Sequence, residues 1–159
     1  ISRSDNVYGG RDLNWSRLIP GAVRSLLRGE APLLRSDGTL TRDYVYIDDM
    51  VNAYLLLASR AHDPEIRGEM FHFATGESTS TLQIVHYLAE IVGRADLTPI
   101  PGGKSAGERV NQERSTDRER DILDWTSRVQ IRDGLASTVA WYRNYFQTTG
   151  ASADSQGVL

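Results

Sequence analysis

The stretch TRDYVYIDDMVNAYLLLA, residues Thr41 to Ala58, decides the fold class because two different patterns meet in it. Its first half ends in Tyr44 to Ile47, aromatic and β-branched residues that favour a β-strand. Its second half, from Met50 onward, is almost entirely apolar, which predicts a helix that is buried on more than one side. A strand that leads directly into a buried helix is typical of α/β proteins.

Charged residues lie on both sides of this strand. Arg42 and Asp43 precede it, and Asp48 and Asp49 separate it from the helix. Aspartate at the start of a helix accepts hydrogen bonds from free backbone N–H groups, so Asp48 or Asp49 is predicted to cap this helix rather than to form a catalytic carboxylate pair. From the residues alone, Arg42 and Asp43 are interpreted as a solvated ion pair.

Helical and extended patterns alternate through the rest of the chain. Apolar spacing predicts a helix from Leu18 that ends at Gly29, and another that Ser80 caps and Gly93 ends. Further helices are predicted over residues 117–123 and through residues 135–146, and short strands over residues 1–4, 32–35, 69–74 and 97–100. The small, polar residues 148–159 predict a disordered tail.

Composition limits the classes of function. With 159 residues, 40% of them hydrophobic and 25% charged, the chain has the size of one domain or of a lobe of a larger one. A formal net charge of −3 gives no overall attraction to nucleic acid or to anionic membranes. There is no cysteine, which excludes disulfides and thiolate metal sites. Short apolar stretches and an N-terminus without a signal pattern predict a cytoplasmic protein.

Several motifs of nucleotide and metal chemistry are incomplete. Residues 101–108, PGGKSAGE, contain Gly-Lys-Ser, but Thr98 stands where a phosphate-binding P-loop requires glycine. The three histidines have no metal-ligand spacing, so no metal is predicted. No G-x-G-x-x-G occurs, and Ile100 precedes the single lysine, Lys104, at the position of a Tyr-x-x-x-Lys tyrosine. The sequence therefore contains neither a dinucleotide fingerprint nor that catalytic pair.

Five short segments follow one another at regular separations. They are RSDNVYG (3–9), LIP (18–20), TRDYVYIDD (41–49), GEMFHFATGESTS (68–80) and VAWY (139–142). In this order they resemble the C-terminal half of an extended short-chain dehydrogenase/reductase, the family of NAD-dependent epimerases and dehydratases of nucleotide sugars. The resemblance extends to about Phe146. The amino-acid sequence from Gly9 to Pro20 is most similar to that of sugar 4,6-dehydratases of the CDP-glucose type.

The resemblance implies an α/β fold in which residues 1–147 form the last Rossmann strands and a small mixed α/β substrate-binding lobe. In the family, the glycine fingerprint and the catalytic tyrosine and lysine precede the segment that matches Arg3 to Gly9. The resemblance therefore implies a longer, homodimeric parent enzyme that binds NAD. These 159 residues alone are not expected to bind NAD or to transfer hydride, and no catalytic residue is assigned to them.

The resemblance also implies how a nucleotide-diphosphate sugar is held. Arg42 matches the family arginine that pairs with the diphosphate, and guanidinium geometry suits two phosphate oxygens. Asn6 matches an asparagine beside the bound sugar nucleotide, although a turn asparagine is an equal interpretation. The start of the next helix offers the backbone N–H groups of Leu18 and Ile19 to a phosphate.

A second basic contact is expected from Arg109 or Arg114, and the choice between them stays open. Tyr44 and Tyr46 are interpreted as packing residues. An alternative function is a non-catalytic binding or interaction module that keeps the lobe without the chemistry. Whether the parent catalyses epimerisation, dehydration or decarboxylation, and on which nucleotide sugar, is not determined by these residues.

Overall fold

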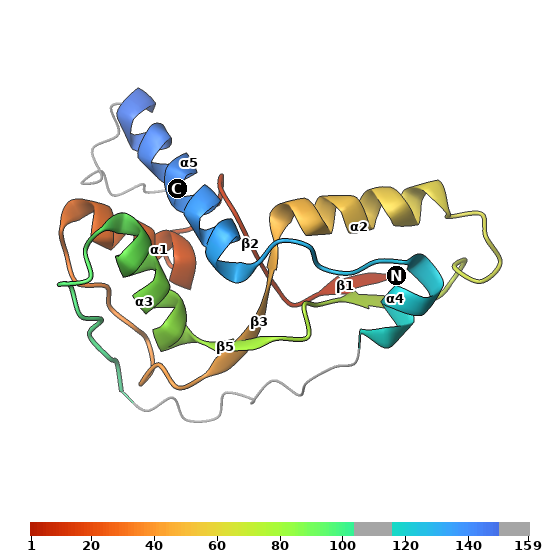
Figure 1. The fold of residues 1–159 in the computed structure, drawn as a ribbon, viewed down its shortest axis with the longest axis horizontal. Helices are drawn as coiled ribbons and strands as arrows, with labels where there is room; N and C mark the ends of the chain where they lie inside the picture. The colour runs from red at the N-terminus through yellow and green to blue at the C-terminus, as the bar shows by residue number, and fades with distance from the viewer. Residues whose placement is uncertain (104–115, 150–159) are drawn as a thin grey trace. The chain divides into compact units, whose positions relative to one another are not determined.

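The computed structural model describes residues 1–103 and 116–149 (Figure 1). The chain divides into two compact units. The first comprises residues 1–8, 41–79 and 110–131, and the second comprises residues 9–40, 80–109 and 132–159. The mixture of helices and strands confirms the predicted α/β class.

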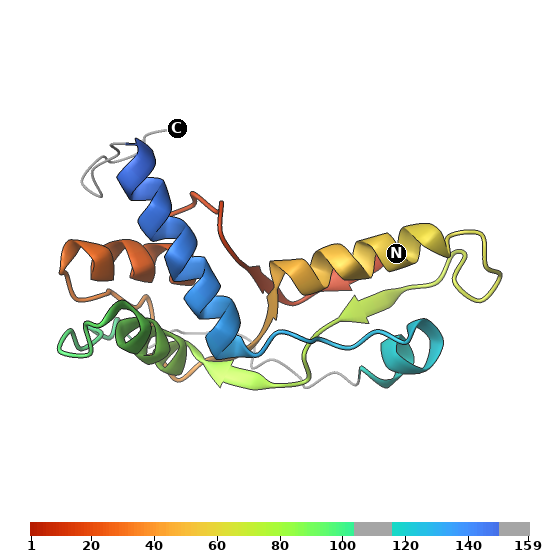
Figure 2. The same ribbon diagram turned by 45° about the horizontal axis from the view of Figure 1, so that its top comes forward.

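The first unit contains two small sheets and two helices. Its elements are β1 (Ser2–Ser4), β2 (Asn6–Tyr8), β3 (Thr41–Tyr46), β4 (Phe71–Phe73), α2 (Ile47–Ser59) and α4 (Asp117–Leu123). β1 and β4 form a parallel pair and lie side by side in Figures 1 and 2. β2, β3 and β5 (Ser78–Ser80) form a second sheet in that order, in which β2 and β3 are parallel. The strand β2 was not predicted from the sequence.

The two edges of strand β4 are used differently. The backbone N–H of Phe71 donates to the carbonyl oxygen of Ile1, at 2.9 Å, and so belongs to the pairing with β1. The N–H of the next residue, His72, points to the other side and donates to the carboxylate of Glu119, at 2.6 Å. Glu119 lies on α4 and is 3% exposed. A buried side chain thus closes the outer edge of β4 at this position.

The core of the first unit lies between α2 and the strands. Met50 and Ala53 of α2 are buried with Phe71 and Phe73 of β4 and with Trp125. Helix α2 is nevertheless less enclosed than its apolar sequence predicts. Three of its large side chains are about half exposed or more: Val51 (47%), Tyr54 (54%) and Leu55 (64%). Within the described residues, α2 is therefore covered on one side.

The predicted cap of α2 is wrong. The helix begins at Ile47, directly after β3, with Tyr46 at the capping position and no side-chain cap. Asp48 and Asp49 therefore lie inside the first turn. The carboxylate of Asp49 is turned to another part of the chain, where it accepts hydrogen bonds from the hydroxyl of Ser127 and from the backbone N–H groups of residues 128 and 129, at 2.8, 3.1 and 3.0 Å. Asp49 is 2% exposed and fastens this segment to the helix.

The second unit is mostly helical. It contains α1 (Leu18–Arg28), α3 (Thr81–Val92) and α5 (Ile131–Thr149), and α1 and α3 lie side by side (Figure 2). The predicted ends of α1 and α3 are confirmed, because Gly29 and Gly93 have φ angles of 79° and 83°, which favour glycine. The strands predicted over 32–35 and 97–100 are reduced to one bridge between Leu33 and Ile100.

Helix α5 continues to Thr149, the second residue of the predicted tail, and the remaining tail lies outside the described residues. In the described part of the chain, no helix combines the length and the apolar character that a membrane span requires.

Ser80 caps α3 as predicted, since its hydroxyl oxygen accepts a hydrogen bond from the backbone N–H of Gln83 at 3.1 Å. We expect Ser80→Ala to lower the free energy of unfolding by about 1 kcal/mol, because the donor at the helix start loses its partner. Urea unfolding measures the change. Ser78→Ala, at an exposed position of β5, is the matched control and is expected to change stability by less than about 0.5 kcal/mol. Equal losses in both variants would contradict the capping role.

Candidate functional site

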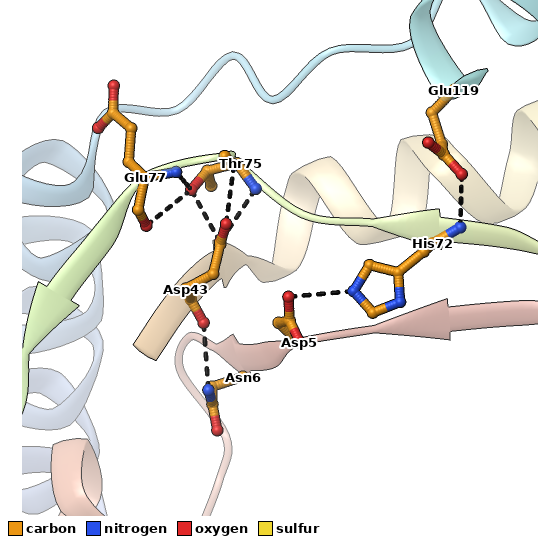
Figure 3. A network of polar contacts seen from close by, with 8 residues as sticks. Asp5, Asn6, Asp43, His72, Thr75, Glu77 and Glu119 are labelled. Atoms are coloured by element: carbon orange, nitrogen blue, oxygen red, sulfur yellow. Dashed lines mark hydrogen bonds and ion pairs between the residues drawn. The ribbon is translucent and has the colours of Figure 1, made fainter. Parts of the chain in front are cut away.

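Asn6 and Arg42 lie together in the first unit. The parallel register places Asn6 of β2 opposite Tyr44 of β3, and Arg42 precedes Tyr44 by two residues. Because side chains alternate along a strand, Arg42, Tyr44 and Asn6 share one face of this sheet. The side-chain amide of Asn6 donates to the backbone carbonyl of Asp43 at 3.2 Å (Figure 3). The structure therefore brings together the asparagine and the arginine that the sequence motifs single out.

Asp43 is not part of a solvated pair, so that interpretation from the residues alone is wrong. It is 7% exposed, and its carboxylate points to the turn after β4 (Figure 3). There it accepts hydrogen bonds from the backbone N–H and the hydroxyl of Thr75, at 2.9 and 2.8 Å, and from the N–H of Gly76, at 2.7 Å. Asp43 thus fixes this turn to the strand that carries Arg42.

His72 and Asp5 form a second polar contact in the first unit. The imidazole Nε2 of His72 lies 3.0 Å from a carboxylate oxygen of Asp5, just beyond the end of β1 (Figure 3). Both side chains are mostly buried. Among the described residues, no group of three or more histidines and carboxylates is placed to hold a metal ion. The contact therefore links β4 to the segment that carries Asn6.

A pocket opens beside Tyr44 in the first unit. It is lined by Tyr44, Thr75, Glu77, Thr79, Ser127, Val129, Gln130 and Ile131. Burial raises the pKa of Tyr44 to about 12, although the positive charge of Arg42 opposes this shift, so the phenol is neutral at physiological pH. Tyr44 packs edge-on against Tyr8, with ring centroids 6.4 Å apart, as its interpretation as a packing residue predicts.

The pocket itself was not predicted from the sequence. Its walls come from three segments that are far apart in the chain, and no local pattern in the sequence connects Tyr44 with Glu77 or Ser127. Only the structure reveals the pocket. Two buried aspartates of the stretch 41–58 hold its lining in place: Asp43 accepts a hydrogen bond from Thr75, and Asp49 accepts one from Ser127.

The other predicted ligand residues are in different parts of the chain. Leu18 is the first residue of α1, in the second unit, and no side chain caps this helix. The first N–H groups of a helix lack partners within it, so those of Leu18 and Ile19 are available as donors. Ile19 as a whole is 4% exposed, so its side chain is not available to a ligand. Arg109 and Arg114 lie outside the described residues.

Comparison with known proteins identifies similar sequences. The profile of the NAD dependent epimerase/dehydratase family matches residues 1–71. The UDP-glucose 4-epimerase of Mycolicibacterium smegmatis is 34% identical over 144 residues, which are 89% of this chain and 44% of that protein. The dTDP-glucose 4,6-dehydratase of Streptomyces griseus is 29% identical over 147 residues, which are 91% of this chain and 43% of that protein.

A solved structure has the same fold. The UDP-glucuronic acid 4-epimerase of Bacillus cereus, in complex with UDP-glucuronic acid and NAD, superimposes with a TM-score of 0.75 at 26% identity. The match covers 91% of this chain and 45% of that one. The chain thus spans less than half the length of the relatives it matches.

Proposed function

Because the chain belongs to the NAD-dependent epimerase/dehydratase family, as its motifs predict, we propose that it is the C-terminal, substrate-binding portion of a nucleotide-sugar epimerase or dehydratase. The observation that carries this proposal is the placement of Arg42 and Asn6 on one face of the β2–β3 pair. A cation and an amide beside each other suit a ligand that combines phosphate with hydroxyl groups.

In this proposal Arg42 holds the diphosphate. Its planar guanidinium presents several N–H donors, which bind two phosphate oxygens at once and fix the orientation of the ligand. Asp43, the next residue, keeps the strand in place through its three hydrogen bonds to the turn at residues 75–76. Asn6 supplies an amide on the same face for sugar hydroxyl or phosphate oxygens.

The redox chemistry belongs to other parts of the parent enzyme in this proposal. NAD, when bound, takes up and returns a hydride. The sequence of this chain lacks the glycine-rich fingerprint and the Tyr-x-x-x-Lys pair, so no residue of it is assigned to NAD or to proton transfer. A homodimeric parent and a cytoplasmic location remain predictions from the family resemblance and the composition.

Arg42→Ala tests the proposal. In the complete protein, we expect the dissociation constant for UDP-glucose or dTDP-glucose, measured by calorimetry, to rise roughly 10- to 100-fold, because a charge-assisted contact with phosphate is lost. Arg42→Lys is expected to recover part of the affinity, since lysine keeps the charge without the paired donors.

Arg67→Ala is the matched control, because Arg67 is exposed in the same unit and its loss changes the net charge equally. Equal affinities of Arg42→Ala and Arg67→Ala would contradict the proposed role. Turnover of the nucleotide sugar by the complete protein separates an enzyme from a non-catalytic binding module, which would bind the ligand without converting it.

A further inference from the structure

We propose that Asp5 and His72 are positioning residues, whose contact holds Asn6 in the orientation that the ligand requires. The proposal rests on the proposed function, in which Asn6 supplies an amide to the nucleotide sugar. Three observations support it: Asp5 is the single residue between two strands, its contact with His72 is mostly shielded from water, and Asn6 itself is held from a second side.

Asp5 lies where the chain passes from one sheet to another. Strand β1 ends at Ser4 and β2 begins at Asn6, so only Asp5 separates them. The two strands belong to different sheets, because β1 pairs with β4 and β2 pairs with β3. The backbone angles at Asp5 therefore determine the direction in which β2 begins, and a rotation there displaces the Asn6 side chain.

The side chain of His72 restrains Asp5. The parallel register places Arg3 opposite His72, and Asp5 follows Arg3 by two residues, which brings it to the same side of the β1–β4 pair. The imidazole Nε2 and a carboxylate oxygen of Asp5 lie 3.0 Å apart (Figure 3). The backbone of His72 is itself fixed, since its N–H donates to the carboxylate of Glu119.

Burial strengthens this restraint. The side chains of His72 and Asp5 are 15% and 24% exposed. Water competes less for a shielded polar contact than for one on the surface, and removing either partner leaves the other without its bond in a mostly buried place. The contact therefore restrains Asp5 more firmly than an exposed pair would.

Asn6 is held from a second side by β3. Its amide donates to the carbonyl oxygen of Asp43, at 3.2 Å, and the carboxylate of Asp43 accepts two hydrogen bonds from Thr75. Figure 3 shows these contacts as a series that runs from His72 through Asp5 and Asn6 to Asp43 and Thr75. Because His72 and Thr75 are only three residues apart in the chain, the series closes on itself. A closed series of contacts leaves little freedom to any of its members.

The held amide still has bonding capacity for a ligand. A side-chain amide carries two N–H groups and one acceptor oxygen. Within the described residues, Asn6 uses this group for one hydrogen bond, to Asp43, and the residue is exposed. A side chain that is already oriented loses less conformational entropy when a ligand binds. We therefore expect the Asp5–His72 contact to raise the affinity for the ligand without touching it.

His72→Leu tests the proposal, because it removes the imidazole and keeps an apolar side chain in the strand. In the complete protein, calorimetry measures the dissociation constant for UDP-glucose or dTDP-glucose, whichever binds the wild type more tightly. We expect His72→Leu and Asp5→Ala each to weaken binding about three- to tenfold, which is the contribution of about one hydrogen bond from Asn6. The double variant is expected to bind no more weakly than either single variant, since both changes break the same contact.

The dependence on Asn6 separates positioning from a purely structural role. In an Asn6→Ala background, we expect His72→Leu to change the dissociation constant less than about twofold, because no amide remains to be positioned. A structural role would weaken binding equally in both backgrounds. His72→Gln keeps a hydrogen-bond donor for Asp5 and is expected to recover most of the affinity. His62→Leu, the same change at an exposed histidine of the same unit, is the matched control and is expected to leave binding unchanged.

The possible outcomes distinguish this proposal from the proposed function. Wild-type affinity in His72→Leu, or an equal loss with and without the Asn6 amide, would overturn the positioning role, while weaker binding in Arg42→Ala would leave the proposed function standing. Unchanged affinity in both His72→Leu and Arg42→Ala, or no binding of either ligand to the wild type, would overturn both. If the melting temperature shows that His72→Leu does not fold, Asp5→Ala in the two backgrounds gives the same comparison.

Discussion

Replacing Asp49 with alanine is expected to lower the free energy of unfolding by about 3–5 kcal/mol. The side chain is 2% exposed, and its carboxylate accepts three hydrogen bonds from residues 127–129. A hydrogen bond to a charged group contributes about 1.5–3 kcal/mol, and the variant also leaves two backbone N–H groups without an acceptor. The expected loss is large because this one carboxylate accepts all three hydrogen bonds that link residues 127–129 to the helix.

Urea unfolding followed by circular dichroism measures this effect. Asp48→Ala is the matched control, because Asp48 is the exposed neighbour of Asp49 in the same helical turn. We expect it to change stability by less than about 0.5 kcal/mol. Asp49→Asn keeps the shape and one acceptor oxygen, so an intermediate loss is expected. A loss in Asp49→Ala as small as that in Asp48→Ala would show that the segment 127–129 is held by other contacts.

Replacing Phe73 with alanine is expected to cost about 3–5 kcal/mol of stability, since it leaves a cavity in the core of the first unit. Phe73 is fully buried in the core cluster that also contains Val45, Met50 and Trp125, and its ring meets that of Trp125 edge-on, with centroids 4.8 Å apart. The lost aromatic contact adds to the loss of buried area. Phe73→Leu keeps most of the apolar volume and is expected to cost clearly less.

The same urea titration measures these core variants. Met70→Ala is the control, because Met70 precedes β4 and is 46% exposed. It is expected to lower stability by less than about 0.5 kcal/mol. If Phe73→Ala and Phe73→Leu were equally stable, the site would collapse around the smaller side chain, and the core would be less rigidly packed than its burial indicates.

The helices were predictable because their signals are local. Gly29, Ser80 and Gly93 determine ends by their own conformations or by a hydrogen bond three residues away, and the structure confirms all three. The short helix α4 has the predicted bounds, residues 117–123. The strands were less predictable, because β2 is three residues long and exists only through its pairing with β3, far along the chain.

The residues of the candidate site also differ in how far they could be predicted from the sequence. Arg42 and Asn6 were found through motifs that resemble a family, and the register of β2 and β3 then placed them on one face. The roles of Asp43 and Asp49 were missed, since each carboxylate binds residues more than thirty positions away. The pocket was missed for the same reason, because its lining residues are far apart in the sequence and meet only in the folded chain.

Glu119 blocks the addition of a further strand at the outer edge of β4. Because its carboxylate already accepts the N–H of His72, that amide is not available to an additional strand, and a strand that displaced Glu119 would leave a buried charge without its donor. One glutamate of α4 therefore protects this edge of the sheet against pairing with a strand of another chain.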